Sequence, residues 1–186
     1  DFKRPGVDHV KTIIACIALG ILAACGMPPP DVVTDHGLEL YFEDYIVTTN
    51  HIEILTEHVM EAMHAANPAV YTLAAMRTVL HHNRPRVFFV DNFFNCANSD
   101  GRCAGRYEVN FDDITVVTTS EPIYNTALAH EMIHFFRHRV GRVDEDGYHS
   151  PKFYFTFNSV ENVANNLACA AIDQSPLCVA YLAAMP

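Results

Sequence analysis

Apolar residues recur at helical spacing through much of the first half of the chain. Apolar positions three or four residues apart indicate one buried face of an amphipathic helix. This pattern predicts helices over residues 36–50 and 51–66, and over 69–80 either a third helix that begins after Pro68 or a continuation of the second. In the first segment the apolar positions are Leu38, Tyr41, Phe42, Tyr45 and Ile46.

The pattern changes after residue 85. Runs rich in β-branched and aromatic residues predict strands over residues 86–90, 107–110 and 114–119. Helical spacing returns over residues 121–140 and 160–172. We expect Ser120 to cap the first of these helices, with Pro122 in its first turn, and Gly141 to end it. Helices, a small antiparallel or mixed sheet and further helices predict a single α+β domain.

The N-terminal segment has the pattern of an export signal. Basic residues precede an apolar run from Ile13 to Ala24, which at about 12 residues is too short to span a bilayer as a helix. The run ends in Leu22-Ala23-Ala24-Cys25-Gly26, which resembles the lipobox of bacterial lipoproteins. A buried core helix with an incidental cysteine is the alternative interpretation.

The lipobox resemblance implies cleavage before Cys25, whose sulfur would carry the lipid. Residues 1–24 would then be a signal peptide, residues 25–32 a lipid-anchored, proline-rich tether, and residues 33–186 the folded domain. The protein would be anchored to a bacterial membrane in the cell envelope, on the periplasmic side or at the cell surface.

Composition narrows the function classes. The chain has 186 residues, of which 50% are hydrophobic and only 18% are charged, so intrinsic disorder is excluded. Its 12 Lys and Arg residues against 22 Asp and Glu residues give a net charge of −10. We expect no nucleic-acid partner, because such proteins need a positive surface to displace counterions from phosphates.

Four cysteines of the predicted domain fall into two local pairs. Cys96 and Cys103 flank one turn-rich segment, and Cys169 and Cys178 flank another. In an oxidising compartment, loop entropy favours one disulfide within each pair. A four-cysteine zinc site is the alternative, but such sites usually contain CxxC motifs, and this sequence has none.

The strongest chemical signal is the HExxH motif of His130-Glu131-Met132-Ile133-His134. Positions i and i+4 share a helix face, so both imidazoles could bind one zinc ion, and the glutamate could serve as general base. A catalytic zinc needs a third protein ligand. His138 is too far along the same helix, whereas His149 and Glu161 both remain candidates, although Asn158 and Glu161 also fit a capping box.

The motif and its surroundings resemble the SprT-like zinc metallopeptidases, the family that includes Spartan. HEMIH is followed by fourteen residues and then by His149-Ser150-Pro151-Lys152-Phe153, where the family has His-Gly-Pro-x-Phe. Residues 114–122 resemble the strand and turn that precede the family's active-site helix. The resemblance implies a zincin-like fold and one zinc ion per chain, with His130, His134 and His149 as ligands and Glu131 as the base.

Together these features predict an exported, membrane-tethered zinc endopeptidase acting on a peptide or protein substrate. Glu131 would activate a zinc-bound water molecule, and Tyr148 is a candidate donor to the oxyanion, with Tyr154 and Arg142 as alternatives. A non-catalytic envelope lipoprotein with a structural or vestigial metal site is the alternative function. An intracellular protease acting at DNA is disfavoured by the acidic charge, the signal and the paired cysteines.

Overall fold

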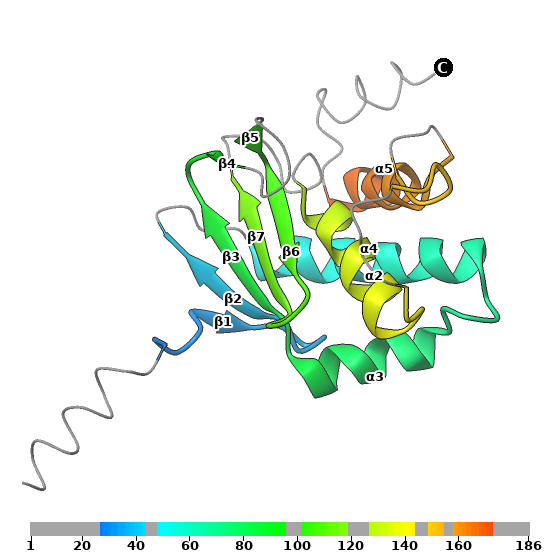
Figure 1. Cartoon of the computed structure of the whole chain (residues 1–186), viewed down its shortest axis with the longest axis horizontal. Helices are drawn as coiled ribbons and strands as arrows, with labels where there is room; N and C mark the ends of the chain where they lie inside the picture. The colour runs from blue at the N-terminus through cyan, green and yellow to red at the C-terminus, as the bar shows by residue number, and fades with distance from the viewer. Residues whose placement is uncertain are drawn as a thin grey trace, which may run out of the picture.

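The computed structural model describes residues 27–43, 48–95, 102–118, 127–143, 149–154 and 158–172. Within these ranges the chain forms four helices, a five-stranded sheet and a two-stranded sheet (Figure 1). The predicted α+β class is therefore confirmed. The expected signal peptide and Cys25 lie outside the described residues.

The larger sheet is mixed and has the strand order β1-β2-β3-β7-β6. Its three central strands are parallel, and each edge strand pairs antiparallel to its neighbour. In this spatial order the strands are β1 (Val32–Val33), β2 (Glu39–Phe42), β3 (Arg86–Val90), β7 (Asp113–Val117) and β6 (Gly105–Glu108). The smaller sheet pairs β4 (Phe94–Asn95) with β5 (Arg102–Cys103).

The helices gather on one side of this sheet (Figure 1). They are α2 (Thr49–Ala66), α3 (Leu73–Asn83), α4 (Leu128–Arg139) and α5 (Val160–Ile172). Helix α4 packs against β6 and β7 and also contacts α2 and α5. The helix that carries the HExxH motif is thus enclosed by the sheet and by other helices.

The core lies between the sheet and these helices. Alternate residues of the central strands are buried there, as the period of two along a strand requires. Val87 and Phe89 of β3 pair in register with Ile114 and Val116 of β7, and Leu40 of β2 lies beside Val87. All five side chains are at most 1% exposed. The polar and aromatic residues between them face the other side of the sheet.

The predicted helix over residues 36–50 is wrong. Residues 39–42 form strand β2, which pairs parallel to β3 from Glu39 with Arg86 to Phe42 with Phe89. Short apolar runs fit both helix and strand patterns, and here pairing with a distant strand decides the outcome. The rings of Phe42 and Phe89 stack with their centroids 5.2 Å apart, which adds cross-strand stabilisation. Residues 44–47 lie outside the described ranges.

The other predicted elements are confirmed, the strand over 86–90 and the helix over 160–172 with the predicted bounds and the rest with shifted boundaries. Helix α3 begins at Leu73 rather than after Pro68, because the Thr72 side chain accepts a hydrogen bond from the Ala75 N–H and caps the helix there. Helix α4 begins at Leu128, with Ala127 at its N-cap, and ends before Gly141 as expected. The expected start at Ser120 and Pro122 lies outside the described residues.

Candidate metal centre

Helix α4 supplies two of the three histidines of the site. His130 and His134 are one turn apart and therefore lie on the same face of the helix. His134 is 8% exposed and His130 is partly buried. Arg137, His138 and Arg139 occupy the last turn, where positive charge interacts favourably with the helix dipole.

The C-terminal end of α4 is fixed to the turn between β6 and β7. Asp112 of this turn is 6% exposed and accepts hydrogen bonds from Arg139 Nε (2.7 Å), Tyr107 Oη (2.7 Å) and Asn83 Nδ2 (2.8 Å). Burial is the main cause of the raised pKa of Tyr107, so its phenol stays protonated and donates to Asp112. His138 lies 3.2 Å from the Tyr107 hydroxyl and is therefore engaged away from the histidine pair.

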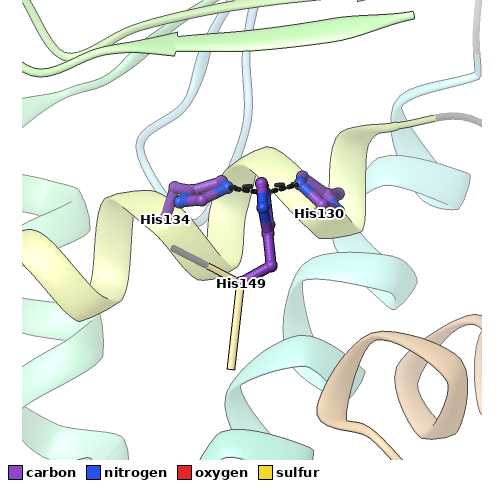
Figure 2. Close-up of side chains that lie close together, drawn as sticks. All are labelled: His130, His134 and His149. Carbon is purple, nitrogen blue, oxygen red and sulfur yellow. Dashed lines mark hydrogen bonds between the residues drawn. The ribbon is translucent and has the colours of Figure 1, made fainter. Parts of the chain in front are cut away.

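The third histidine comes from the segment between α4 and α5. His149 precedes a turn in which the Ser150 carbonyl accepts from the N–H groups of Phe153 and Tyr154. Figure 2 shows the imidazoles of His130, His134 and His149 converging on one point. The Nε2 atom of His149 lies 3.0 Å from that of His130 and 3.2 Å from that of His134, and the α4 pair is 3.2 Å apart.

This triangle of nitrogen atoms is suited to a metal ion. The three histidines lie close enough to bind one together. A point about 2 Å from all three Nε2 atoms lies just outside the plane of the triangle, and about 2 Å is the length of a metal–imidazole bond. His130 and His149 are only partly buried, so solvent or a further ligand can approach the centre. The residues present therefore fit a metal with three protein ligands.

Glu161 lies behind His130, although the sequence left it open as a ligand. Its Oε1 atom is 3.3 Å from Nδ1 of His130, the ring nitrogen opposite the one in the triangle. A carboxylate can only accept, so Nδ1 carries the proton and Nε2 directs its lone pair toward the other histidines. This is the usual arrangement of a carboxylate that orients a metal-binding histidine.

The expected capping box at Asn158 and Glu161 is wrong. Ser159 is the residue that precedes α5, and its Oγ accepts a hydrogen bond from the Asn162 N–H at 3.3 Å. The Glu161 side chain therefore interacts with His130, while its backbone N–H donates to the Phe153 carbonyl. The first turn of α5 therefore contacts both His130, through the Glu161 side chain, and the segment after His149, through the Glu161 backbone.

Glu131 lies between the two helical histidines and is 6% exposed. Its side chain packs against Gly105 of β6, where a Cβ atom would lie 2.5 Å from Glu131 Oε1 and 2.9 Å from its Cγ. Glycine is therefore required there by the close approach of α4 to the sheet edge. The sequence contains no signal for this contact, because the two residues are distant along the chain.

Tyr154 makes contacts at the site that the sequence did not indicate. It is fully buried, and its ring contacts all three imidazoles. Its hydroxyl accepts a hydrogen bond from Arg137 Nη1 at 3.5 Å, and its role as a donor to an oxyanion stays a prediction. The candidate donor Tyr148 lies outside the described residues. Arg142 lies two residues beyond the C-cap of α4, where its backbone φ is left-handed at 52°, and its role as a donor stays a prediction.

Two of the four domain cysteines are described, and both are disulfide-bonded. These are Cys103 on β5 and Cys169, which is fully buried on α5. The expected partners, Cys96 and Cys178, lie outside the described residues, so the pairing stays a prediction. None of the described helices has the length and apolar character that crossing a bilayer requires.

The site therefore rests on its own geometry: three convergent imidazoles, a carboxylate behind one of them, and a buried glutamate on the same helix. No family model matches the chain, and neither a curated protein nor a solved structure matches it.

Proposed function

We propose that the protein is a zinc-dependent endopeptidase of the SprT-like type, exported and tethered to a bacterial membrane by a lipid on Cys25. The observation that carries the proposal is the convergence of the His130, His134 and His149 Nε2 atoms within 3.2 Å of one another. Three neutral imidazoles with an open fourth position are typical of a catalytic zinc site. The near-equal sides of the triangle, 3.0, 3.2 and 3.2 Å, would suit the tetrahedral coordination that zinc prefers.

In this proposal the chain's own residues divide the work. A bound zinc ion supplies Lewis acidity toward water and the scissile carbonyl. Glu131 accepts a proton from the attacking water and delivers it to the leaving amine. Glu161 holds the Nδ1 proton of His130 and so maintains the tautomer whose Nε2 can bind the metal. Burial of Glu131 excludes competing water from its carboxylate.

The test separates metal binding from catalysis. The full chain is purified without chelators, its zinc content is measured, and cleavage of an unstructured protein such as casein is followed. We expect one zinc per chain, and we expect Glu131→Gln to keep the zinc but to lose nearly all cleavage. Glu61→Gln, an exposed glutamate paired with His58 on α2, is the matched control and should cleave like the wild type.

The outcomes distinguish the two functions considered. Zinc without cleavage, or equal cleavage by Glu131→Gln and wild type, would contradict the enzyme and favour a non-catalytic envelope lipoprotein. Absence of zinc from the wild type would remove the metal site as well. Anchoring is tested separately: Cys25→Ser should abolish incorporation of a labelled fatty acid and release the protein from the membrane fraction.

A further inference from the structure

Tyr154 occupies a central position beneath the three histidines. It lies five residues after His149, in the short segment that leads to α5, and its side chain is 0% exposed. Its backbone N–H donates to the Ser150 carbonyl at 3.1 Å, which fixes the turn that carries both His149 and Tyr154. The position of this ring is therefore coupled to that of the histidine.

One aromatic ring touches every member of the triangle. The Tyr154 centroid lies 4.6 Å from the His130 ring, 4.8 Å from the His134 ring and 4.8 Å from the His149 ring. The contact with His134 is stacked at 27°, and that with His149 is edge-on at 84°. Each imidazole thus packs on a different part of the same rigid surface, which restricts its rotation about χ2.

A buried arginine holds this ring from the other side. Arg137 follows His134 by three residues on α4 and is 7% exposed. Its Nη1 atom donates to the Tyr154 hydroxyl at 3.5 Å, and its Cζ atom lies 5.5 Å from the Tyr154 centroid and 5.2 Å from that of Phe153. The guanidinium is therefore stabilised by two aromatic rings and in return fixes the hydroxyl end of Tyr154.

We propose that Tyr154 is a positioning residue for the metal centre, and that Arg137 keeps its ring in place. The inference rests on the proposed zinc site. A metal that binds three mobile histidines must first order them, and each ordered side chain reduces the affinity. Packing against Tyr154 orders the imidazoles when the chain folds, so the entropy cost of ordering them no longer reduces the affinity for the metal.

The experiment measures zinc affinity and metal geometry on the full chain. Zinc is titrated in competition with a chromophoric chelator, and cobalt(II) replaces zinc for visible absorption. Tyr154→Leu removes the ring and should weaken zinc binding about 10–100-fold and alter the cobalt bands. Tyr154→Phe keeps the ring, and its zinc affinity should stay within about threefold of wild type, because the imidazoles pack against the ring and not against the hydroxyl.

A matched control separates positioning from general packing. Phe135 is also fully buried on α4, but its described ring contacts are with Tyr107 and Phe136. Phe135→Leu should therefore lower thermal stability yet leave zinc affinity and the cobalt spectrum unchanged. Equal losses of affinity in Phe135→Leu and Tyr154→Leu would overturn the proposal, as would wild-type affinity and spectrum in Tyr154→Leu.

A further variant keeps the test decisive if Tyr154→Leu does not fold. Arg137→Met retains an apolar stem of similar length but removes the guanidinium that lies over the rings of Tyr154 and Phe153, so we expect weaker zinc binding and altered cobalt bands. Wild-type values in that variant would overturn the role of Arg137. The two proposals fail on different results. If the wild type binds zinc but cleaves no peptide, the proposed function is wrong. If the wild type is active and Tyr154→Leu binds zinc as tightly as it does, the positioning role of Tyr154 is wrong.

Discussion

Replacing Gly105 by alanine tests whether the sheet edge sets the position of the proposed base. The added Cβ would lie 2.5 Å from the Ala127 Cβ and the Glu131 Oε1, and 2.9 Å from the Glu131 Cγ. Carbon atoms in contact are ordinarily about 3.5–4.0 Å apart, so the approach to Ala127 is short by about 1 Å. The carboxylate can rotate away, but Ala127 Cβ is attached to the backbone at the start of α4, so the helix itself must move.

The expected effects follow from that displacement. Overpacking of a well-packed interior costs about 1–3 kcal/mol, so we expect the free energy of unfolding to fall by that amount in thermal or urea denaturation. A catalytic group misplaced by about 1 Å can lose about 100-fold in rate. We therefore expect kcat/KM of Gly105→Ala to fall by about that factor while zinc content stays at one per chain.

A control variant and a compensating substitution test whether steric contact causes the loss. Arg106 is the next residue on β6, its side chain is exposed, and Arg106→Ala should change stability by less than about 0.5 kcal/mol. Adding Ala127→Gly to Gly105→Ala removes the closest carbon and should restore part of the lost stability. Wild-type stability and activity in Gly105→Ala would refute the argument that β6 and α4 are in steric contact at this point.

Three further predictions concern the metal and the support of α4. Glu161→Gln should weaken zinc binding about 10–100-fold in a chelator competition, and an unchanged affinity would argue against its role behind His130. Asp112→Ala should lower the free energy of unfolding by about 2–4 kcal/mol because it leaves Arg139 without its buried partner, whereas Tyr107→Phe should cost about 1 kcal/mol; equal losses would contradict the network. Free zinc at 100 times its Kd should stabilise the fold by about 2.7 kcal/mol, measured by thermal unfolding, and His149→Ala should abolish the shift.

Much of the secondary structure could be predicted because its signals are local. The spacing of apolar residues identified α2 and α5, and β-branched composition identified β3 and β7. Strand β2 could not be recognised in the same way, because its apolar positions also suit a helix. Its identity depends on hydrogen bonds to β3, a strand more than forty residues farther along the chain. Boundary residues such as Thr72 shifted for a related reason, since caps depend on individual side-chain contacts.

The sequence by itself determined the HExxH pair, because the spacing of His130 and His134 places them on one face of any helix that contains them. Only the tertiary structure decided between His149 and Glu161, since both follow α4 and the path of the chain sets which one meets the pair. The tertiary structure also decided that Gly105, Tyr154 and Arg137 lie against the residues of the site. Their positions arise from packing between segments distant in sequence, and packing of this kind leaves no periodic pattern along the chain.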